Sequence, residues 1–456
     1  MKQDPAAVLP MHDQAYERDL GDCLRVRYST PEDLDRLVAM YCSVFRPKED
    51  APPNPIMGHW IRDMTSGRHP HITGYDFALV DDTRTERIVA ATCLLANRAR
   101  FAHIPFMMGR PEIVATEIPY RNRHLQRAIF DLIHARSAAR GHLMQGITGI
   151  PNFYRQFGYE FAIDLGAARH VYFSALPPLE PGKPALYALR PAVEEDIPAL
   201  IALSAREQAC WQVATVLDEE AWRWMVFDSN PAAGNFGATY MITSTDGPAV
   251  GYMMLSRLRH GDSVDIAGMA VHEGVSLAEV APQALRAARE IVGTFPCRPA
   301  DSPPPARFRL EMGPGHALFD ALGPDMAPLT GSHYAWWIRF PDVPAFVRLI
   351  APILEQRVEQ SVLAGYTGEF CIDFYRGGLR LDFAQGRLVT VEPWRKPLWG
   401  ASQAECPAPI FTQLLLGYRG VADLAYAHID VRAEGVNRTV LETLFPVRPS
   451  CMWPLD

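Results

Sequence analysis

The sequence lacks the features of secreted, membrane-bound and nucleic-acid-binding proteins. Its first twenty residues carry charged side chains such as Lys2, Asp4 and Asp13 and contain no long apolar run, so we expect neither a signal peptide nor a membrane anchor. Basic residues are fewer than acidic ones: the sequence has 44 Lys and Arg and 52 Asp and Glu, which gives a formal net charge of −8. This balance argues against nonspecific binding to nucleic acid or to an anionic membrane. We therefore expect a cytoplasmic protein with neither kind of partner.

Metal-binding and disulfide patterns are also missing. The 8 cysteines are scattered without a Cys-x-x-Cys pair, which is typical of small core residues in a reducing compartment. His69-Pro-His71 offers two ligands, but no third follows at a useful spacing. We predict a surface turn at this position and no metal site.

The chain has 456 residues, which is too long for a domain with a single hydrophobic core. Its length suggests about three units of usual domain size. Residues 24–28 alternate like a strand, and the next segment opens a helix with Thr30 as N-cap and Pro31 at its first position. The same design returns about 163 residues later, where Arg190 aligns with Arg27 and Asp196 with Asp33. Two mixed α/β units of one ancestry are the simplest interpretation.

A hairpin follows in each repeat. In the first repeat, residues 77–80 and 88–95 form its strands, and Asp81-Asp82 is the predicted turn. In the second repeat, the strands are expected at 240–243 and 250–255.

The last part of the chain has a different pattern. Apolar residues at helical spacing predict a helix over 346–358. Alternating segments joined at Gly377-Gly378 and Gln385-Gly386 then predict an antiparallel meander, and another helix begins near Pro409.

Four segments result from these patterns. The predicted domains are a flexible tail (1–22), a first α/β domain (23–182), a second α/β domain (183–340) and a C-terminal helix-plus-meander domain (341–456).

The most informative stretch is Glu112-Ile-Val-Ala-Thr-Glu-Ile-Pro-Tyr-Arg-Asn-Arg-His-Leu-Gln-Arg. It predicts a strand that runs through an arginine-rich turn into a helix beginning near Leu125. The unpaired N–H groups and positive dipole at such a helix start suit a pyrophosphate, and Arg121, Arg123 and Arg127 add charge-assisted contacts. The strand at 264–271 of the second repeat is followed by a turn without arginine, so we expect no phosphate loop there.

This stretch resembles motif A of the GCN5-related N-acetyltransferases, the GNAT superfamily, whose usual form is Arg/Gln-x-x-Gly-x-Gly/Ala. Arg121 matches, whereas His124 and Gln126 stand where the two glycines are expected. A glycine lets a backbone amide approach phosphate without a Cβ in the way. The side chains of His124 and Gln126 therefore leave less room for a phosphate group to approach the backbone. An imidazole partly compensates, because it donates a hydrogen bond to phosphate and becomes cationic below about pH 6.5.

The order of the domains resembles the Eis (enhanced intracellular survival) family of acetyltransferases. The sharpest local match is Phe153-Tyr-Arg-Gln-Phe-Gly-Tyr, which is similar to that family's Ile-Tyr-Gly-Arg-Phe-Gly-Tyr. The resemblance implies a C-terminal domain like a sterol carrier protein (SCP2-like), a hexameric homo-oligomer, Tyr154 as general acid and the terminal carboxylate of Asp456 as general base. The end of this chain departs from the aromatic terminus of that family.

Taken together, the sequence predicts an acetyl-CoA-dependent N-acetyltransferase that acts by direct transfer on a primary amine of an aminoglycoside, a polyamine or a lysine-like acceptor. The alternative is a noncatalytic binding protein with a decayed CoA loop that holds an apolar ligand. Tyr154 and Asp456 are the predicted catalytic residues. The predicted acetyl-CoA contacts are Val114, Ala115, Thr116, Arg121, Asn122, Arg123, His124, Leu125, Gln126, Arg127, Gly149 and Ile150.

Overall fold

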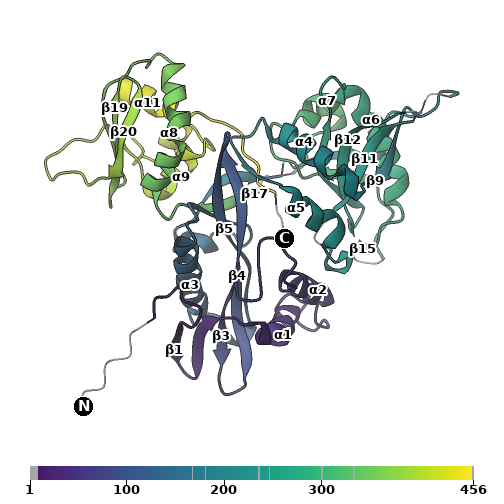
Figure 1. The fold of residues 1–456 in the computed structure, drawn as a ribbon, viewed down its shortest axis with the longest axis horizontal. Helices are drawn as coiled ribbons and strands as arrows, with labels where there is room; N and C mark the ends of the chain where they lie inside the picture. Colours follow the sequence, from purple (N-terminus) through teal and green to yellow (C-terminus); the bar gives the residue numbers. More distant parts are fainter. Residues whose placement is uncertain are drawn as a thin grey trace. The chain divides into compact units, whose positions relative to one another are not determined.

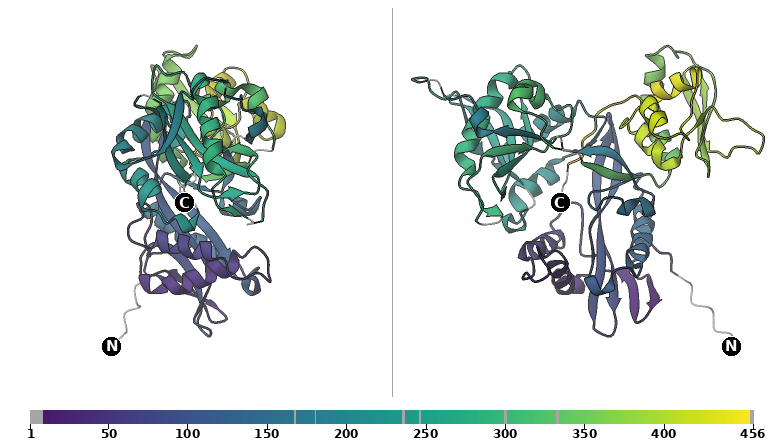
Figure 2. Two further views of the ribbon diagram at one scale, coloured as in Figure 1. Left: turned by 90° about the vertical axis from the view of Figure 1, so that its right-hand side faces the viewer. Right: turned by 180° about the vertical axis from the view of Figure 1, so that it is seen from behind.

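The computed structural model describes residues 9–166, 168–179, 181–234, 237–245, 247–298, 301–331 and 334–453. The chain forms two compact units, which are drawn in Figures 1 and 2. The first comprises residues 1–97, 107–149 and 228–234, and the second comprises 98–106, 150–227 and 235–456.

The first unit is a mixed sheet with helices on both faces (Figure 1). Its strands, in the spatial order β1-β2-β3-β4-β5-β6, are β1 (Glu17–Gly21), β2 (Leu24–Tyr28), β3 (Phe77–Asp82), β4 (Arg87–Phe101), β5 (Ile104–Thr116) and β6 (Met144–Ile147). Its helices are α1 (Leu34–Val44), α2 (Pro55–Met64) and α3 (Leu125–Ala139). The ends of β4 and β5 at residues 98–106 belong to the second unit.

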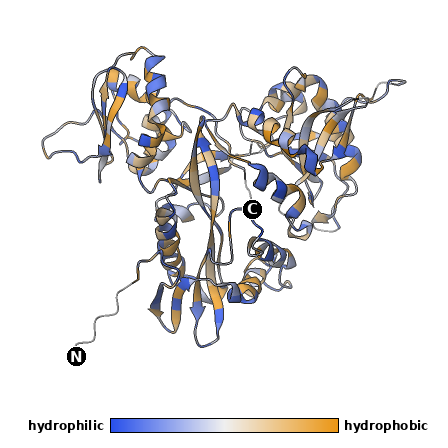
Figure 3. Cartoon of the chain, in the orientation of Figure 1, coloured by the Kyte–Doolittle hydropathy of each residue, from blue (hydrophilic) through white to orange (hydrophobic). Residues whose placement is uncertain are grey.

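Side-chain alternation along the strands explains why both faces are covered. On β3, Phe77 and Leu79 pack in the core beneath α1 and α2. Ala78 and Val80 point to the opposite face and pack in the core beneath α3. The helices also show hydrophobic and hydrophilic residues side by side, as amphipathic helices do (Figure 3).

Two local predictions for this unit were wrong. Residues 17–21, assigned to a flexible tail, form β1, which pairs antiparallel with β2. The sequence of β1 is too polar to stand out, because it lies at the edge of the sheet. The predicted turn at Asp81-Asp82 is instead the end of β3, and the turn is at residues 83–86. Asp81 is buried because Arg27 and Arg36 donate to its carboxylate at 2.6 and 2.5 Å.

The second unit contains the other repeat and the C-terminal part of the chain. Its strands are β7 (Glu160–Leu165), β8 (Arg169–Tyr172), β9 (Tyr187–Pro191), β10 (Val213–Thr215), β11 (Gly237–Ser244), β12 (Ala249–Ser256), β13 (Arg259–His260), β14 (Ser263–Val271), β15 (Cys297–Arg298), β16 (Arg307–Leu310), β17 (Tyr334–Arg339), β18 (Gly368–Asp373), β19 (Gly378–Ala384), β20 (Arg387–Pro393) and β21 (Ala404–Glu405). Its helices are α4 (Ile197–Gln208), α5 (Glu219–Arg223), α6 (Leu277–Val292), α7 (Ala317–Met326), α8 (Val343–Glu359), α9 (Ala408–Leu415), α10 (Val421–Ala427) and α11 (Val436–Leu444).

The sheet of the second repeat has the order β15-β13-β14-β12-β11-β9, with β16 bridging β14 and β8. It repeats the packing of the first unit: Met253 and Leu255 of β12 face α6 and α7, whereas Tyr252 and Met254 face α4 and α5. The predicted mixed α/β fold with two related units is confirmed.

The aligned arginines and aspartates form the same motif in both repeats. Arg27 donates to both carboxylate oxygens of Asp33 at 2.7 and 2.8 Å, and Arg190 does so to Asp196 at 2.6 and 2.7 Å. Each aspartate also accepts a backbone N–H three residues earlier, at 2.9 Å in both cases. This arrangement fixes the start of α1 and of α4. The bond from Arg190 lowers the pKa of Asp196.

The C-terminal part contains the predicted helix, as α8, and the predicted meander, in which β18, β19 and β20 pair antiparallel. Gln385 and Gly386 both have positive φ (50° and 78°), as the tight turn between β19 and β20 requires. The further division of the chain into the four predicted domains remains a prediction.

The last described residues are firmly bound within the second unit. Cys451 N–H donates to Val213 O at 2.9 Å, and Trp453 N–H donates to Thr215 Oγ1 at 3.0 Å. The Trp453 side chain is buried. Every helix in the described residues is too short or too polar to cross a bilayer.

Candidate functional site

The carboxyl end of β5 separates from its parallel neighbour. Among the described residues, the pairing of β5 with β6 is confined to Met108 with Met144 and Gly109 with Gln145. Further along β5, Ile113 has φ 48°, which is a strained conformation for a β-branched residue. The register with β6 therefore does not include residues 110–116, where the strand bends at Ile113.

The turn after β5 leads into α3, which begins at Leu125 as predicted. Asn122 and His124 both have left-handed backbone conformations, with φ 62° and 58°. His124 stands where the motif has its first glycine and keeps a glycine-like conformation despite its side chain. Its exposed side chain makes no capping hydrogen bond to the helix.

Gln126, at the second glycine position, connects the helix start to the sheet. Its Nε2 donates to Ala115 O at 2.7 Å and to Thr116 Oγ1 at 3.0 Å. Its Oε1 accepts from Thr92 Oγ1 at 3.0 Å. The side chain is therefore bound to β4 and β5 and holds the end of β5 in place.

The arginines of the turn are exposed or half-buried. Arg121 Nε donates to Thr116 O at 3.3 Å. Arg123 forms an ion pair with Asp22 at 2.8 Å and lies over the Tyr120 ring. Arg127 N–H donates to His124 O at 3.0 Å in the first turn of α3. The structure thus brings the predicted cationic residues together at the start of one helix.

A cavity of about 590 Å³ adjoins this turn. It is lined by Ser43, Val44, Arg46, Pro47, Lys48, Glu49, Arg87, Glu117, Ile118 and Pro119. Burial raises the pKa of the Glu117 carboxyl, and Arg87, which donates to it at 2.5 Å, opposes that shift. Sequence reasoning missed this cavity, and the charged run that begins at Arg46, after α1, was its only signal.

Tyr154 lies in the short helix η3 (Phe153–Phe157) of the second unit. Its side chain is 2% exposed, and its ring contacts Phe153, Tyr159 and Trp337 with centroids 5.1, 6.3 and 6.1 Å away. The tight packing fixes the orientation of the phenol ring. Burial also raises the pKa of the neighbouring Tyr159.

The remaining predicted site residues are dispersed. Gly149 has φ 123° and follows β6, and Ile150 is exposed. Asp456 lies outside the described residues, three positions after the bound Trp453. In the second repeat, Ser276 is the N-cap residue of α6 and makes no side-chain capping hydrogen bond.

The His69-Pro-His71 segment differs from the predicted surface turn. His69 is buried, and its Nδ1 accepts the backbone N–H of His71 at 3.1 Å, so it serves the local backbone. Within the described ranges, no group of three or more His, Cys, Asp or Glu residues is arranged to hold a metal ion.

Comparison with known proteins agrees with this geometry. Residues 25–162 match the family described as acetyltransferase (GNAT) domain, whereas no curated protein matches the sequence. Among solved structures, the chain is similar to a GCN5-related N-acetyltransferase from Kribbella flavida, with 16% identity, TM-score 0.64 and coverage of 95% of this chain and 98% of that one.

Two further structures are similar over almost their whole length. One is a GCN5-related N-acetyltransferase from Anabaena variabilis, with 13% identity, TM-score 0.64 and coverage of 94% and 99%. The other is Eis1 from Mycobacterium abscessus, with 14% identity, TM-score 0.57 and coverage of 93% and 98%. At these identities the likeness establishes the fold. The family match over residues 25–162 confirms the predicted class of enzyme, a GNAT-type N-acetyltransferase.

Proposed function

We propose that this chain transfers the acetyl group of acetyl-CoA to a primary amine. The separation of β5 from β6, with Ile113 in a strained conformation and α3 starting directly after the turn, is the observation that carries the proposal. It offers backbone outside the β5–β6 pairing for an extended cofactor arm and a helix start for its pyrophosphate.

The phosphate end of the cofactor is assigned to the turn. The first N–H groups of α3 and the guanidinium groups of Arg121, Arg123 and Arg127 surround this position. Arg123 exchanges its ion pair with the exposed Asp22 for one with phosphate when the cofactor binds. Leu125 is buried and anchors the helix start, while Asn122 and His124 shape the approach.

The reaction needs three events at the other end of the cofactor. The ammonium group of the acceptor loses a proton, the free amine attacks the thioester carbonyl, and the C–S bond breaks as the thiolate takes a proton. Backbone N–H groups of Val114, Ala115 and Thr116 polarise the carbonyl oxygen. Gln126 supports this role because it fixes Ala115 and Thr116 in position.

Tyr154 is assigned as the acid that protonates the thiolate, and the terminal carboxylate of Asp456 as the base. The packed ring of Tyr154 supports a fixed direction for its hydroxyl. The bound segment up to Trp453 supports a fixed starting point for the last three residues.

Three finer features are proposed along with this activity. The helix-plus-meander part at 341–456 is an SCP2-like domain, the chain assembles as a hexamer in the cytoplasm, and the acceptor is an aminoglycoside, a polyamine or a lysine-like amine. Each rests on the resemblance of the sequence to the Eis family.

The alternative, a noncatalytic protein with a decayed CoA loop, is favoured by one observation. His124 retains its side chain at a position that needs a left-handed backbone, which restricts the approach of phosphate.

Calorimetry with acetyl-CoA separates the two functions, followed by thiol release across an amine library. Saturable binding and acceptor-dependent release support the enzyme. Absence of acetyl-CoA binding supports the alternative. A short C-terminal tag, which displaces the terminal carboxylate, should lower turnover and leave acetyl-CoA affinity unchanged.

A further inference from the structure

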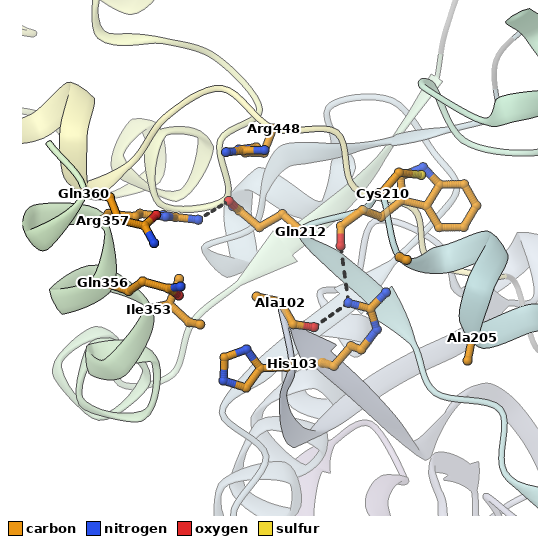
Figure 4. A pocket seen from close by; sticks show the side chains of 13 residues that line it. Ala102, His103, Ala205, Cys210, Gln212, Ile353, Gln356, Arg357, Gln360 and Arg448 are labelled. Atoms are coloured by element: carbon orange, nitrogen blue, oxygen red, sulfur yellow. Dashed lines mark hydrogen bonds between the residues drawn. The ribbon is translucent and has the colours of Figure 1, made fainter. Parts of the chain in front are cut away.

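A second cavity, of about 540 Å³, lies within the second unit and has no part in the proposed transfer. Its lining includes Arg100, His103, Cys210, Gln212, Arg357 and Arg448. Figure 4 shows Arg357 and Gln356 of α8, and Gln360 directly after it, opposite Gln212 and His103. Segments more than 300 residues apart in sequence therefore form one cavity.

The lining is cationic although the whole chain is acidic. Arg100, Arg357 and Arg448 line the cavity, and none of the described lining residues is acidic. Two of the guanidinium groups are held by neutral acceptors. Arg100 donates to Ala102 O and to Gln208 O, and Arg357 donates to Leu444 O at 2.6 Å and to Gln212 Oε1 at 2.7 Å. Neutral acceptors fix their positions and leave their charge uncompensated.

The charges act on one another at this cavity. Burial lowers the pKa of Arg357 to about 10, and the positive charge of Arg448 contributes to the same shift. Burial also lowers the pKa of Arg100. An anion in the cavity relieves both effects, because it supplies the opposite charge that the protein does not place there.

Gln212 adds an independent sign of a missing acceptor. It is 5% exposed. Because a guanidinium group can only donate, the amide atom of Gln212 that is bound to Arg357 must be the oxygen Oε1. Its Nε2 is buried without a hydrogen-bond partner among the described residues. A buried donor of this kind is costly unless a ligand or water accepts its hydrogen.

We propose that this cavity binds a small molecule carrying a phosphoryl dianion. Guanidinium groups from three segments and an amide N–H are donors that match the several oxygens of such a group. The volume lies in the usual range for small-molecule sites, roughly 300–1,000 Å³. The bound phosphoryl group bridges four segments of the second unit. These are the loop between β4 and β5, the end of α4, helix α8 and the segment at Arg448. The inference is independent of the proposed transfer activity.

Isothermal titration of the full chain with inorganic phosphate and with pyrophosphate tests the site. Arg448 is exposed, and its backbone N–H donates to Gly417 O at 3.0 Å, a bond that does not involve the side chain. Arg448→Gln therefore removes the charge and preserves the fold. The matched control is Arg206→Gln, which removes an exposed charge from α4 outside the lining. We expect the Arg448 variant to bind at least about tenfold more weakly and the Arg206 variant to stay within about twofold of the parent.

The Arg123→Ala variant distinguishes phosphate binding in the cavity from phosphate binding at the turn before α3. Binding that survives Arg123→Ala and is weakened by Arg448→Gln supports the cavity. Binding that is lost in Arg123→Ala and kept in Arg448→Gln belongs to the turn and overturns the inference. Absence of saturable binding by the parent, or equal loss in the Arg448 and Arg206 variants, also overturns it.

Discussion

Replacing His124 by glycine and by alanine separates the two effects of this residue. Alanine removes the imidazole and keeps the Cβ, whereas glycine removes both. A left-handed conformation costs an L-residue about 1–2 kcal/mol, and His124 has φ 58°. Glycine relieves that cost but loses about 0.4–1 kcal/mol through the greater freedom of its unfolded chain. We therefore expect His124→Gly to be more stable than His124→Ala by about 1 kcal/mol.

Urea unfolding followed by circular dichroism measures this difference. The matched control is Ala138→Gly in the last turn of α3, an exposed helical position, where glycine should destabilise by up to about 1 kcal/mol. The order of glycine and alanine is thus opposite at the two positions. Equal stability of the two His124 variants would contradict the left-handed start of α3.

The same variants report on the cofactor. If the Cβ obstructs phosphate, His124→Gly binds acetyl-CoA more tightly than His124→Ala in calorimetry. If the imidazole donates a bond, both variants lose about 0.5–1.5 kcal/mol of binding free energy relative to the parent. Identical affinity in all three proteins would show that residue 124 does not contact the ligand and would remove the phosphate assignment of this turn.

Four further substitutions test other parts of the structure. Arg123→Ala should weaken acetyl-CoA binding by about 1.5–3 kcal/mol, and Asp22→Asn should strengthen it because Asp22 competes for Arg123; unchanged calorimetric affinity in both refutes the contact. Tyr154→Phe should keep the fold and lower kcat by about 10²–10⁴-fold, so full turnover with a screened acceptor excludes the acid role. Burial lowers the pKa of His142 to about 4 from its ordinary 6.5. As pH falls, the unfolded state therefore binds the proton before the folded state does. The free energy of unfolding decreases by about 3 kcal/mol between about pH 6.5 and about pH 4. His142→Asn should flatten that part of the pH profile of unfolding, and an unchanged profile would contradict the buried neutral imidazole.

Features that depend on neighbouring residues in the sequence were predictable. Arg27 with Asp33 and Arg190 with Asp196 lie six residues apart and form the same motif at two helix starts. The start of α3 at Leu125 follows from the same local rules. Local spacing was sufficient because each motif is closed by its own backbone and side chains.

Features that depend on distant partners were not predictable. Asp81 resembles a turn residue until Arg27 and Arg36 bury its charge. Gln126 was recognised as a missing glycine, but its bonds to β4 and β5 appear only once the sheet is formed. The cavity around Arg357 was likewise invisible, since its lining residues extend from Arg100 to Arg448.

The distribution of the cysteines has a practical consequence for chemical labelling. Cys42, Cys93, Cys371, Cys406 and Cys451 are buried and Cys297 is half-buried, whereas Cys23 and Cys210 are exposed. Alkylating reagents should therefore modify Cys23 and Cys210 first, and a Cys23→Ser protein leaves Cys210 as the exposed thiol. Because Cys210 lines the arginine-rich cavity, its alkylation rate should fall as phosphate occupies that cavity. Occupancy then becomes readable from the mass of the intact protein, without any knowledge of the acceptor amine.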